Sequence, residues 1–494
     1  MGSPTAPGDR DRPYDRGELT VSCGSGEKRL LLGLDPSHGD GSSKWLLFSL
    51  PLVLPSLGAS TFLVVARITR RRKRPQPDLW GPSGPRRWWL VGAARYRRTM
   101  LNTVAVHGYR SLRELAVPLR QLTVITGANG SGKSSTYRAL RLLADCGRGE
   151  VIGSLAREGG LNSALWAGPE RLGGARRTGR TEGTVRRESV SLALGYAADD
   201  FGYLIDLGLP VYAGIGSQFG RDPEIKREAV FAGPVLRPAG TLAHRDGPYA
   251  AARGDDGEFA KLTQGLPTYR SLLAEYAQPS ALPELAAVRD RLRSWRFYDG
   301  FRADAGAPAR LPQVGTRTPV LADDGRDLAA ALQTIIETGV GADDLAAAVS
   351  EAFEGSTVSV AVRDGLFDVE LSQPGMLRSL RSTELSDGTL RFLLWAAALL
   401  SPEPPSLMVL NEPETSLHPD LLGPLGALIA AAARSTQVLV VTHSQRLCAA
   451  LEVVPVADAS VYDNIEVRLR KDLGETRIEG LGMLELPPWQ WGSR

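Results

Sequence analysis

The residues best suited to chemistry form a glycine-rich run after a short apolar segment. The run is Gly127, Ala128, Asn129, Gly130, Ser131, Gly132, Lys133 and Ser134, with Ser135 next. It fills every fixed position of the G-x-x-x-x-G-K-S/T spacing. Glycines let backbone N–H groups turn inward around a phosphate, the lysine reaches the β- and γ-phosphates, and the serine hydroxyl can bind Mg²⁺. The run therefore predicts a nucleotide site in which Ser134 is a metal ligand.

A second polar group directly follows the apolar residues 407–410. Glu412 stands at the end of this predicted strand, where a carboxylate can orient and deprotonate the water that attacks a γ-phosphate. We therefore expect Glu412 to be catalytic.

Two further segments place single residues where they could meet a phosphate. Ser386 and Gly388 open the helical run 390–400, and a serine-capped helix N-terminus attracts anions. His443 follows the apolar run 438–441, where it could contact a γ-phosphate, although a lone histidine is more often structural. Each signal is weak when it stands alone.

These residues need strands and helices to position them, and the patterning supplies both. Residues 122–126 form a short β-branched run, typical of a buried strand, and residues 135–145 have helical spacing. Further strands are predicted over 187–196, 201–208 and 460–480, and a hairpin with an Asp-Gly turn over 357–371. Residues 270–297 and 327–353 have helical spacing. The fold class expected from this order is α/β.

The ordered motifs resemble one family, the ABC-type ATPases of the RecF/SMC class. They are most similar to small bacterial RecF-like ATPases related to the overcoming-lysogenization-defect proteins. The order is the phosphate loop (Walker A), the signature at residues 385–389, the Walker B residues Asn411 and Glu412, a D-loop at 416–419 and a switch histidine, His443. About 50 residues follow His443, so we expect no Toprim nuclease module. The resemblance covers residues 100–494.

The resemblance implies a P-loop NTPase fold of ABC-ATPase type, with a mixed central sheet, an antiparallel β lobe and a helical lobe. We expect the phosphate loop and β lobe over 100–235, the helical lobe over 236–400, and the Walker B strand, switch histidine and C-terminal hairpin over 401–494. Implied cofactors are ATP and Mg²⁺, and Gln218 is the candidate Q-loop metal ligand. Asn411 stands where the family usually has an aspartate. It keeps an oxygen for Mg²⁺ or a bound water but has no charge, so metal binding should be weaker, because hard cations prefer carboxylates. Two copies would sandwich ATP, with Ser386 of one copy touching the γ-phosphate held by Lys133 of the other.

The composition of the chain excludes several other classes of protein. The chain has 494 residues, of which 43% are hydrophobic and 23% charged, as in globular proteins. Its three cysteines lie far apart, which excludes a disulfide scaffold and a cysteine-rich metal cluster and favours a reducing compartment such as the cytoplasm. Residues 100–494 are slightly acidic overall, so charge alone does not indicate nucleic-acid coating. The arginines of 171–187 fit either a solvated loop or a contact with DNA or an unknown protein partner.

The first 99 residues differ from the rest. Residues 1–44 are rich in Gly, Pro and Ser, and we expect them to be disordered. Residues 45–66 carry no charge and precede six basic residues in 67–74, as in a single transmembrane helix, although Pro51 and Pro55 oppose a helix. Met100 precedes the first regular β pattern. Three readings stay open, namely a start codon placed too far upstream, a membrane anchor and a disordered extension.

Overall fold

The computed structural model describes residues 99–169, 189–210, 218–455, 463–482 and 486–492, and the backbone of 16–23 and 26–33. The chain divides into two compact units, Met1–Ala94 and Arg95–Arg494. In the first, β1 (Arg16–Cys23) and β2 (Gly26–Gly33) pair as an antiparallel hairpin. This corrects the expectation of disorder for residues 16–23 and 26–33, where the β-branched residues Thr20 and Val21 favour a strand and pair with Arg29 and Lys28.

The apolar residues 45–66 and the arginines of 171–187 both lie outside the described residues. Among the residues that are described, no helix has the length and apolar character that crossing a membrane requires.

A largely parallel sheet forms the centre of the second unit. Its strands run in the order β12 (Arg296–Tyr298), β17 (Leu407–Asn411), β18 (Gln437–Val441), β5 (Leu122–Gly127), β20 (Asn464–Asp472) and β19 (Val454–Pro455). All of these neighbours pair in parallel, and β21 (Glu475–Ile478) pairs antiparallel with β20. Loops that follow parallel strands gather at one edge of a sheet.

Both faces of this sheet are buried, because its side chains alternate between two hydrophobic cores. Val409 and Leu439 belong to the first core, together with α1 (Lys133–Arg148) and α6 (Pro283–Ser294). Met408 and Val440 belong to the second, together with α9 (Asp387–Leu399) and α10 (Leu422–Ala433). The uninterrupted apolar runs in the sequence are explained by this burial on both sides.

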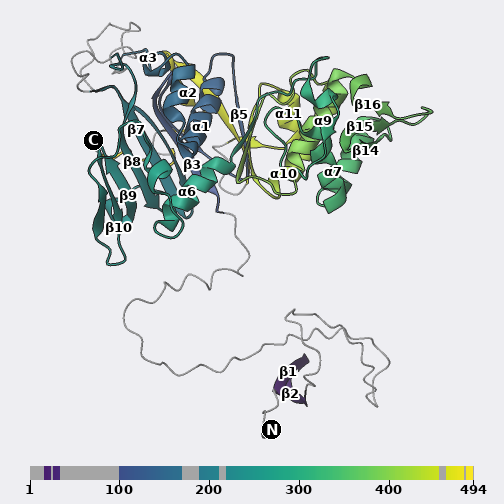
Figure 1. Ribbon diagram of the computed structural model, residues 1–494, viewed down its shortest axis with the longest axis horizontal. Helices are drawn as coiled ribbons and strands as arrows, with labels where there is room; N and C mark the ends of the chain where they lie inside the picture. Colours follow the sequence, from purple (N-terminus) through teal and green to yellow (C-terminus); the bar gives the residue numbers. More distant parts are fainter. Residues whose placement is uncertain are drawn as a thin grey trace, which may run out of the picture. The chain divides into compact units, whose positions relative to one another are not determined.

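An antiparallel sheet lies on the α1 side of the central sheet (Figure 1). Its order is β11 (Phe259–Thr263), β10 (Tyr249–Arg253), β9 (Thr241–Asp246), β8 (Glu224–Ala232), β7 (Phe201–Gly208), β6 (Leu192–Ala198), β3 (Leu101–Tyr109) and β4 (Leu112–Pro118). The sheet therefore continues to Thr263, whereas we expected helices from residue 236. β9 pairs with β8 in a register that buries Ala243 and Arg245, and this pairing extends the sheet beyond residue 236.

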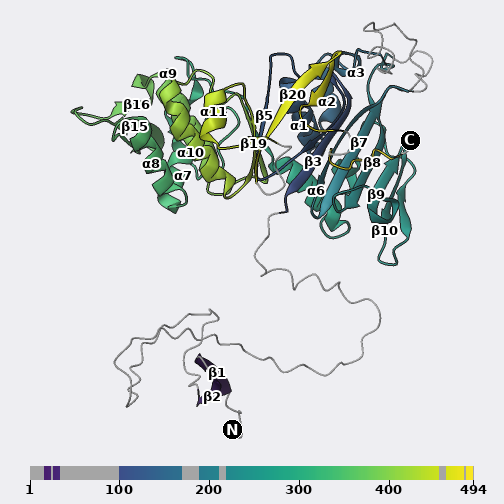
Figure 2. The same ribbon diagram turned by 180° about the vertical axis from the view of Figure 1, so that it is seen from behind.

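The remaining helices are short. On the side of α9 and α10 lie α7 (Leu328–Thr338), α8 (Ala342–Ala352) and α11 (Gln445–Ala450), beside a small sheet of β13 (Gln313–Val314), β14 (Thr357–Arg363), β15 (Leu366–Ser372) and β16 (Leu380–Arg381) (Figure 2). Helices α2 (Val151–Arg157), α3 (Leu161–Ala164) and α5 (Leu272–Tyr276) lie on the α1 side. The expected α/β fold with a mixed sheet and an antiparallel sheet is confirmed.

Candidate nucleotide site

The phosphate loop connects the end of β5 to the start of α1, and its glycines are required by its geometry. Gly127 has φ of 143° and Gly132 has φ of 113°, both unfavourable for other residues. A Cβ at Gly127 would lie 2.3 Å from the carbonyl oxygen of Leu469, and one at Gly132 would lie 2.1 Å from Thr476 Oγ1. The loop is thus packed directly against β20 and β21, the C-terminal hairpin.

The polar side chains of the loop differ in burial. Lys133 is only 6% exposed, and its Nζ donates hydrogen bonds to the carbonyl oxygens of Gly127 at 2.6 Å and Ala128 at 3.2 Å. Ser131 Oγ is buried without a hydrogen-bond partner among the described residues, and Asn129 and Ser134 are exposed. A lysine turned over the loop and a buried hydroxyl suit phosphate oxygens as acceptors, so the loop fits a nucleotide.

Four neighbouring strands end at the same edge of the sheet, which brings the residues that follow them close together. In spatial order, β12, β17, β18 and β5 end at Tyr298, Asn411, Val441 and Gly127. The next residues along the chain are Asp299, Glu412, Thr442 and Ala128. Asn411 and Glu412, although about 280 residues from the loop, therefore lie two strands away from it.

Glu412, Glu414 and His443 form a small acidic and basic cluster at this edge. His443 Nδ1 lies 3.8 Å from Glu412 Oε1 and 3.4 Å from Glu414 Oε1. Glu414 is buried, and its Oε1 accepts hydrogen bonds from Thr442 Oγ1 and, at 3.1 Å, from the backbone N of His443. Glu412 and His443 are 40% and 56% exposed. Glu414 is thus held by β18, whereas Glu412 is accessible to water.

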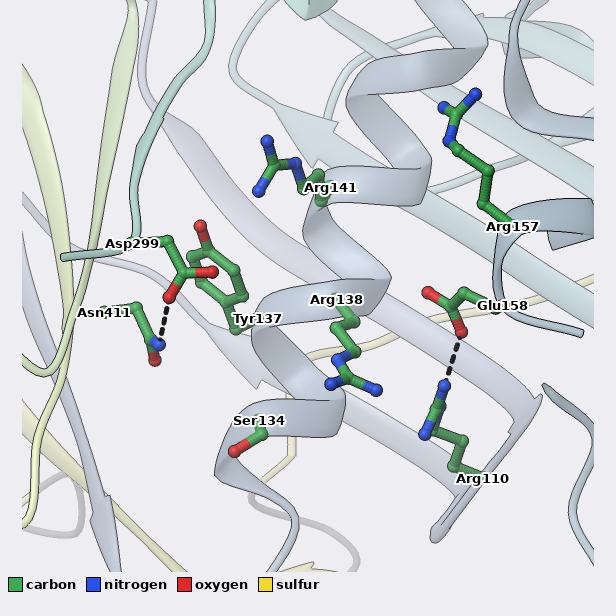
Figure 3. A pocket seen from close by; sticks show the side chains of 9 residues that line it. All are labelled: Arg110, Ser134, Tyr137, Arg138, Arg141, Arg157, Glu158, Asp299 and Asn411. Carbon is green, nitrogen blue, oxygen red and sulfur yellow. Dashed lines mark hydrogen bonds and ion pairs between the residues drawn. The ribbon is translucent and has the colours of Figure 1, made fainter. Parts of the chain in front are cut away.

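A pocket of about 530 Å³ brings Ser134 and Asn411 together (Figure 3). Its remaining lining residues are Arg110, Tyr137, Arg138, Arg141, Arg157, Glu158 and Asp299. Burial and the negative charge of Asp299 raise the pKa of Tyr137. A serine hydroxyl, an amide oxygen and a carboxylate are oxygen donors of the kind that Mg²⁺ prefers, so the residues fit this ion. Sequence reasoning missed Asp299.

The signature turn is held in place by hydrogen bonds from Arg310, a residue that was not predicted from the sequence. Ser386 caps α9, its Oγ accepting a hydrogen bond from Thr389 N at 3.1 Å. Arg310, only 8% exposed, donates to the carbonyl oxygens of Ser382 and Leu385 and, at 2.7 Å, to Asp387 Oδ1. The turn is therefore fixed while Ser386 stays exposed.

Of the predicted site residues, only Ser134 and Asn411 line this pocket, and both Ser386 and Gln218 lie outside it. Ser386 does not line it, and α9 packs on the opposite face of the central sheet from α1 (Figures 1 and 2). Gln218, proposed as a metal ligand, lies in an exposed turn between β7 and β8 and does not line the pocket either. Asp299 stands instead beside Asn411, so the structure gives no support to Gln218 in that role.

Comparison with solved structures gives distant similarity to SMC head domains. A head bound to the C-winged helix domain of ScpA is 12% identical, with a TM-score of 0.41, covering 78% of this chain and 98% of that chain. The SMC head from Thermotoga maritima is 16% identical, with a TM-score of 0.36 and coverage of 78% and 100%. A Pyrococcus furiosus head with an extended coiled coil, bound to the C-terminal domain of ScpA, is 11% identical, with a TM-score of 0.41 and coverage of 78% and 97%. No curated protein matches the chain.

Family comparison gives a closer assignment. Residues 122–225 and 270–449, more than half of the chain, match one family of ATPase domains. The match begins at β5, before the phosphate loop, and extends past His443. The expected similarity to RecF/SMC-like ABC-class ATPases is confirmed at the level of the ATPase domain family. The chain belongs to the family described as "AAA domain, putative AbiEii toxin, Type IV TA system".

Proposed function

We propose that the chain binds ATP with Mg²⁺ and hydrolyses it to ADP and phosphate. The observation that carries this proposal is the meeting of the phosphate loop, Asn411, Glu412 and His443 at one edge of the parallel sheet. Each residue type has a task in phosphoryl transfer, and residues from three strands separated in sequence meet there.

The proposed roles follow from burial and position. The loop N–H groups and Lys133 hold the phosphates, with the α1 N-terminus adding a partial positive charge. Ser134 and Asn411 contribute oxygens to Mg²⁺, which neutralises charge on the β- and γ-phosphates. Glu412, the exposed carboxylate, accepts the proton of the attacking water, and His443 contacts the γ-phosphate.

A second copy would complete the site. Because α9 lies on the opposite face of the sheet from α1, Ser386 does not share the pocket of Ser134 within one chain. Its exposed, capped position would let it meet a γ-phosphate held by Lys133 of another copy. This supports an ATP-dependent homodimer with a head-to-tail arrangement.

Steady-state phosphate release tests the proposal. The purified chain should release phosphate from Mg-ATP, and Lys133→Ala should abolish that release. A matched control is Lys226→Ala, which removes a half-buried ion pair to Glu224 on β8, outside the phosphate loop. Equal phosphate release by the wild type and Lys133→Ala would contradict the proposal.

A second candidate function is a nucleotide-dependent switch with very slow turnover. Asn411 supports it, because an amide binds a divalent cation less strongly than a carboxylate. The two candidates differ in a single measurement. A switch would change its oligomeric state with Mg-ATP while releasing phosphate at less than about one molecule per minute, far below typical enzymatic turnover.

The downstream task we propose is DNA repair or defence against foreign DNA. The class resemblance supports this, and the family description, which refers to a toxin–antitoxin system, is compatible with defence. A pull-down from native cells with ATP-trapped Glu412→Gln protein, followed by identification of protein and DNA, would test it. Recovery of neither DNA nor a defence or repair protein would count against this task.

A further inference from the structure

We propose that Asp299 supplies the carboxylate of the Mg²⁺ site, next to Asn411, which lacks one. This inference rests on the proposed function, because the ion considered is the one that accompanies ATP. Asp299 and Asn411 would then act as a pair in which the charge comes from the residue after β12 and the amide from the last residue of β17.

The backbone places the two residues side by side. β12 and β17 pair in parallel, with Tyr298 opposite Leu410. The residues that follow these two, Asp299 and Asn411, therefore lie next to each other. Asn411 Nδ2 donates a hydrogen bond to Asp299 Oδ1 at 2.6 Å (Figure 3). This bond assigns the amide nitrogen of Asn411 to Asp299 and leaves its carbonyl oxygen for another partner.

Asp299 also faces the right neighbours. It lines the same pocket as Ser134, the hydroxyl expected to bind Mg²⁺, and lies across that pocket from α1 (Figure 3). Among the residues that the structure describes, none forms an ion pair with Asp299, although four arginines line the same pocket. Of those, Arg110 pairs with Glu158 at 2.7 Å. No described cation therefore lies within ion-pair distance of the Asp299 carboxylate, which stays available to a metal ion.

The charge requirement favours this assignment. Magnesium bound between a protein and nucleotide phosphates usually has one or two carboxylate ligands in addition to the phosphates and keeps several waters. Ser134 and Asn411 together offer two neutral oxygens. Glu412 does not line the pocket with Ser134, and we expect it to accept a proton. Two carboxylates among the described residues line the pocket of Ser134 and Asn411, namely Glu158 and Asp299. Glu158 already pairs with Arg110, which leaves Asp299 for the metal ion.

A simpler role for Asp299 is to hold the amide of Asn411 in place. The two roles respond differently to exchanging the residues. If Asp299 only positions Asn411, then Asp299→Asn should change metal affinity little, because an asparagine oxygen also accepts the hydrogen bond. If Asp299 supplies the charge, then Asp299→Asn should lose the metal, and adding Asn411→Asp should restore it by returning the carboxylate to the adjacent strand.

The experiment measures Mn²⁺ affinity by electron paramagnetic resonance, with a non-hydrolysable ATP analogue present. The full chain, Asp299→Asn and the double variant Asp299→Asn/Asn411→Asp are compared. The control Asp304→Asn removes a carboxylate from the same connection that pairs with exposed Arg302 and does not line the pocket. Affinity for a fluorescent ATP analogue in EDTA reports whether each variant still holds nucleotide without metal.

We expect Asp299→Asn to weaken Mn²⁺ binding by roughly 10–100-fold, while nucleotide affinity in EDTA stays within about threefold. The double variant should recover most of the loss, and Asp304→Asn should match the wild type. Asp299→Asn binding Mn²⁺ within about threefold of wild type would overturn the inference and leave the proposed function intact. A wild type that binds no nucleotide in either buffer would overturn both.

Discussion

Glu412 and His443 face each other from the ends of neighbouring parallel strands, with Glu412 Oε1 3.8 Å from His443 Nδ1. Glu412 adopts φ of 48°, a left-handed conformation that is unfavourable for glutamate, and its backbone N donates to Val441 O at 2.7 Å. The chain thus turns sharply out of β17 at this residue. A conformation that costs on the order of 1 kcal/mol persists only where its surroundings hold it, which is frequent at functional sites.

This geometry predicts the behaviour of Glu412→Gln. The variant should bind Mg-ATP as well as the wild type, because glutamine is nearly isosteric. Phosphate release should fall by roughly 10²–10⁴-fold, since the proton acceptor is lost. Single-turnover phosphate release at saturating Mg-ATP measures this. Hydrolysis at the wild-type rate would show that Glu412 is not the base.

Blocked hydrolysis should also trap the proposed dimer. Glu412→Gln should therefore elute as a dimer with Mg-ATP and as a monomer without it, by size-exclusion chromatography with light scattering. Adding Ser386→Arg should restore the monomer, because it places bulk and charge on an exposed helix N-terminus that would meet the partner's ATP. The control Thr383→Arg alters a nearby exposed residue outside the signature. A Glu412→Gln protein that stays monomeric would contradict the sandwich.

Lys133→Ala should abolish nucleotide binding while leaving the fold intact. Among the described residues, its Nζ donates only to carbonyl oxygens of its own loop, so no other described element depends on it for a hydrogen bond. A charge-assisted contact worth about 1.5–3 kcal/mol should cost more than tenfold in ATP affinity. Calorimetric titration measures the affinity, and thermal unfolding checks the fold. Affinity within about threefold of the wild type would refute the assignment of the loop.

Much of the fold follows from local patterns in the sequence. The hairpin predicted from Asp364 and Gly365 is present as β14 and β15, because both residues adopt the positive φ that such a turn needs. The strands before the phosphate loop, Asn411 and His443 were also predicted, since a strand buried on both faces reads as an apolar run. These signals depend only on neighbours in sequence.

What the sequence could not predict depends on contacts between distant segments. The strand before Asp299 has only three residues, too short for a periodic signal, and its place beside β17 comes from pairing across more than 100 residues. Nothing in the sequence next to Arg310 indicates its role, which depends on contacts with the turn before α9, more than 70 residues further along the chain. Strands β9 to β11 were missed for a local reason, because each has only five or six residues and these are rich in Ala and charged side chains, which suit strands poorly.

The C-terminal hairpin should influence nucleotide binding through Thr476. Its buried Oγ1 donates to the carbonyl oxygen of Ser131 at 2.8 Å and lies 2.8 Å from Ser111 Oγ. Thr476→Val keeps the shape but leaves a buried carbonyl without this partner, at a cost of about 1–3 kcal/mol. We expect a lower melting temperature and several-fold weaker ATP binding. Thr357→Val, an exposed change on β14, is the control and should alter neither. Unchanged ATP affinity in Thr476→Val would exclude this support for the loop.

Arg310 should be needed for the signature turn, because its side chain connects the segment after β12 to the turn before α9. Its guanidinium donates to the carbonyl oxygens of Ala303, Ser382 and Leu385 and to Asp387 Oδ1. Arg310→Met keeps much of the apolar volume but leaves three carbonyl oxygens without their donor. We expect the free energy of unfolding to fall by on the order of 3 kcal/mol, measured by urea denaturation.

Arg310→Lys tests whether charge alone is sufficient at this position. A lysine ammonium is a compact donor that cannot span the same set of acceptors as a planar guanidinium. We therefore expect Arg310→Lys to be destabilised nearly as much as Arg310→Met, and to form less ATP-dependent dimer when combined with Glu412→Gln. The control Arg302→Lys changes an exposed arginine that pairs only with Asp304 among the described residues and should behave like the wild type. Full stability and full dimer formation in Arg310→Lys would mean that the position of Ser386 does not depend on the arginine fork.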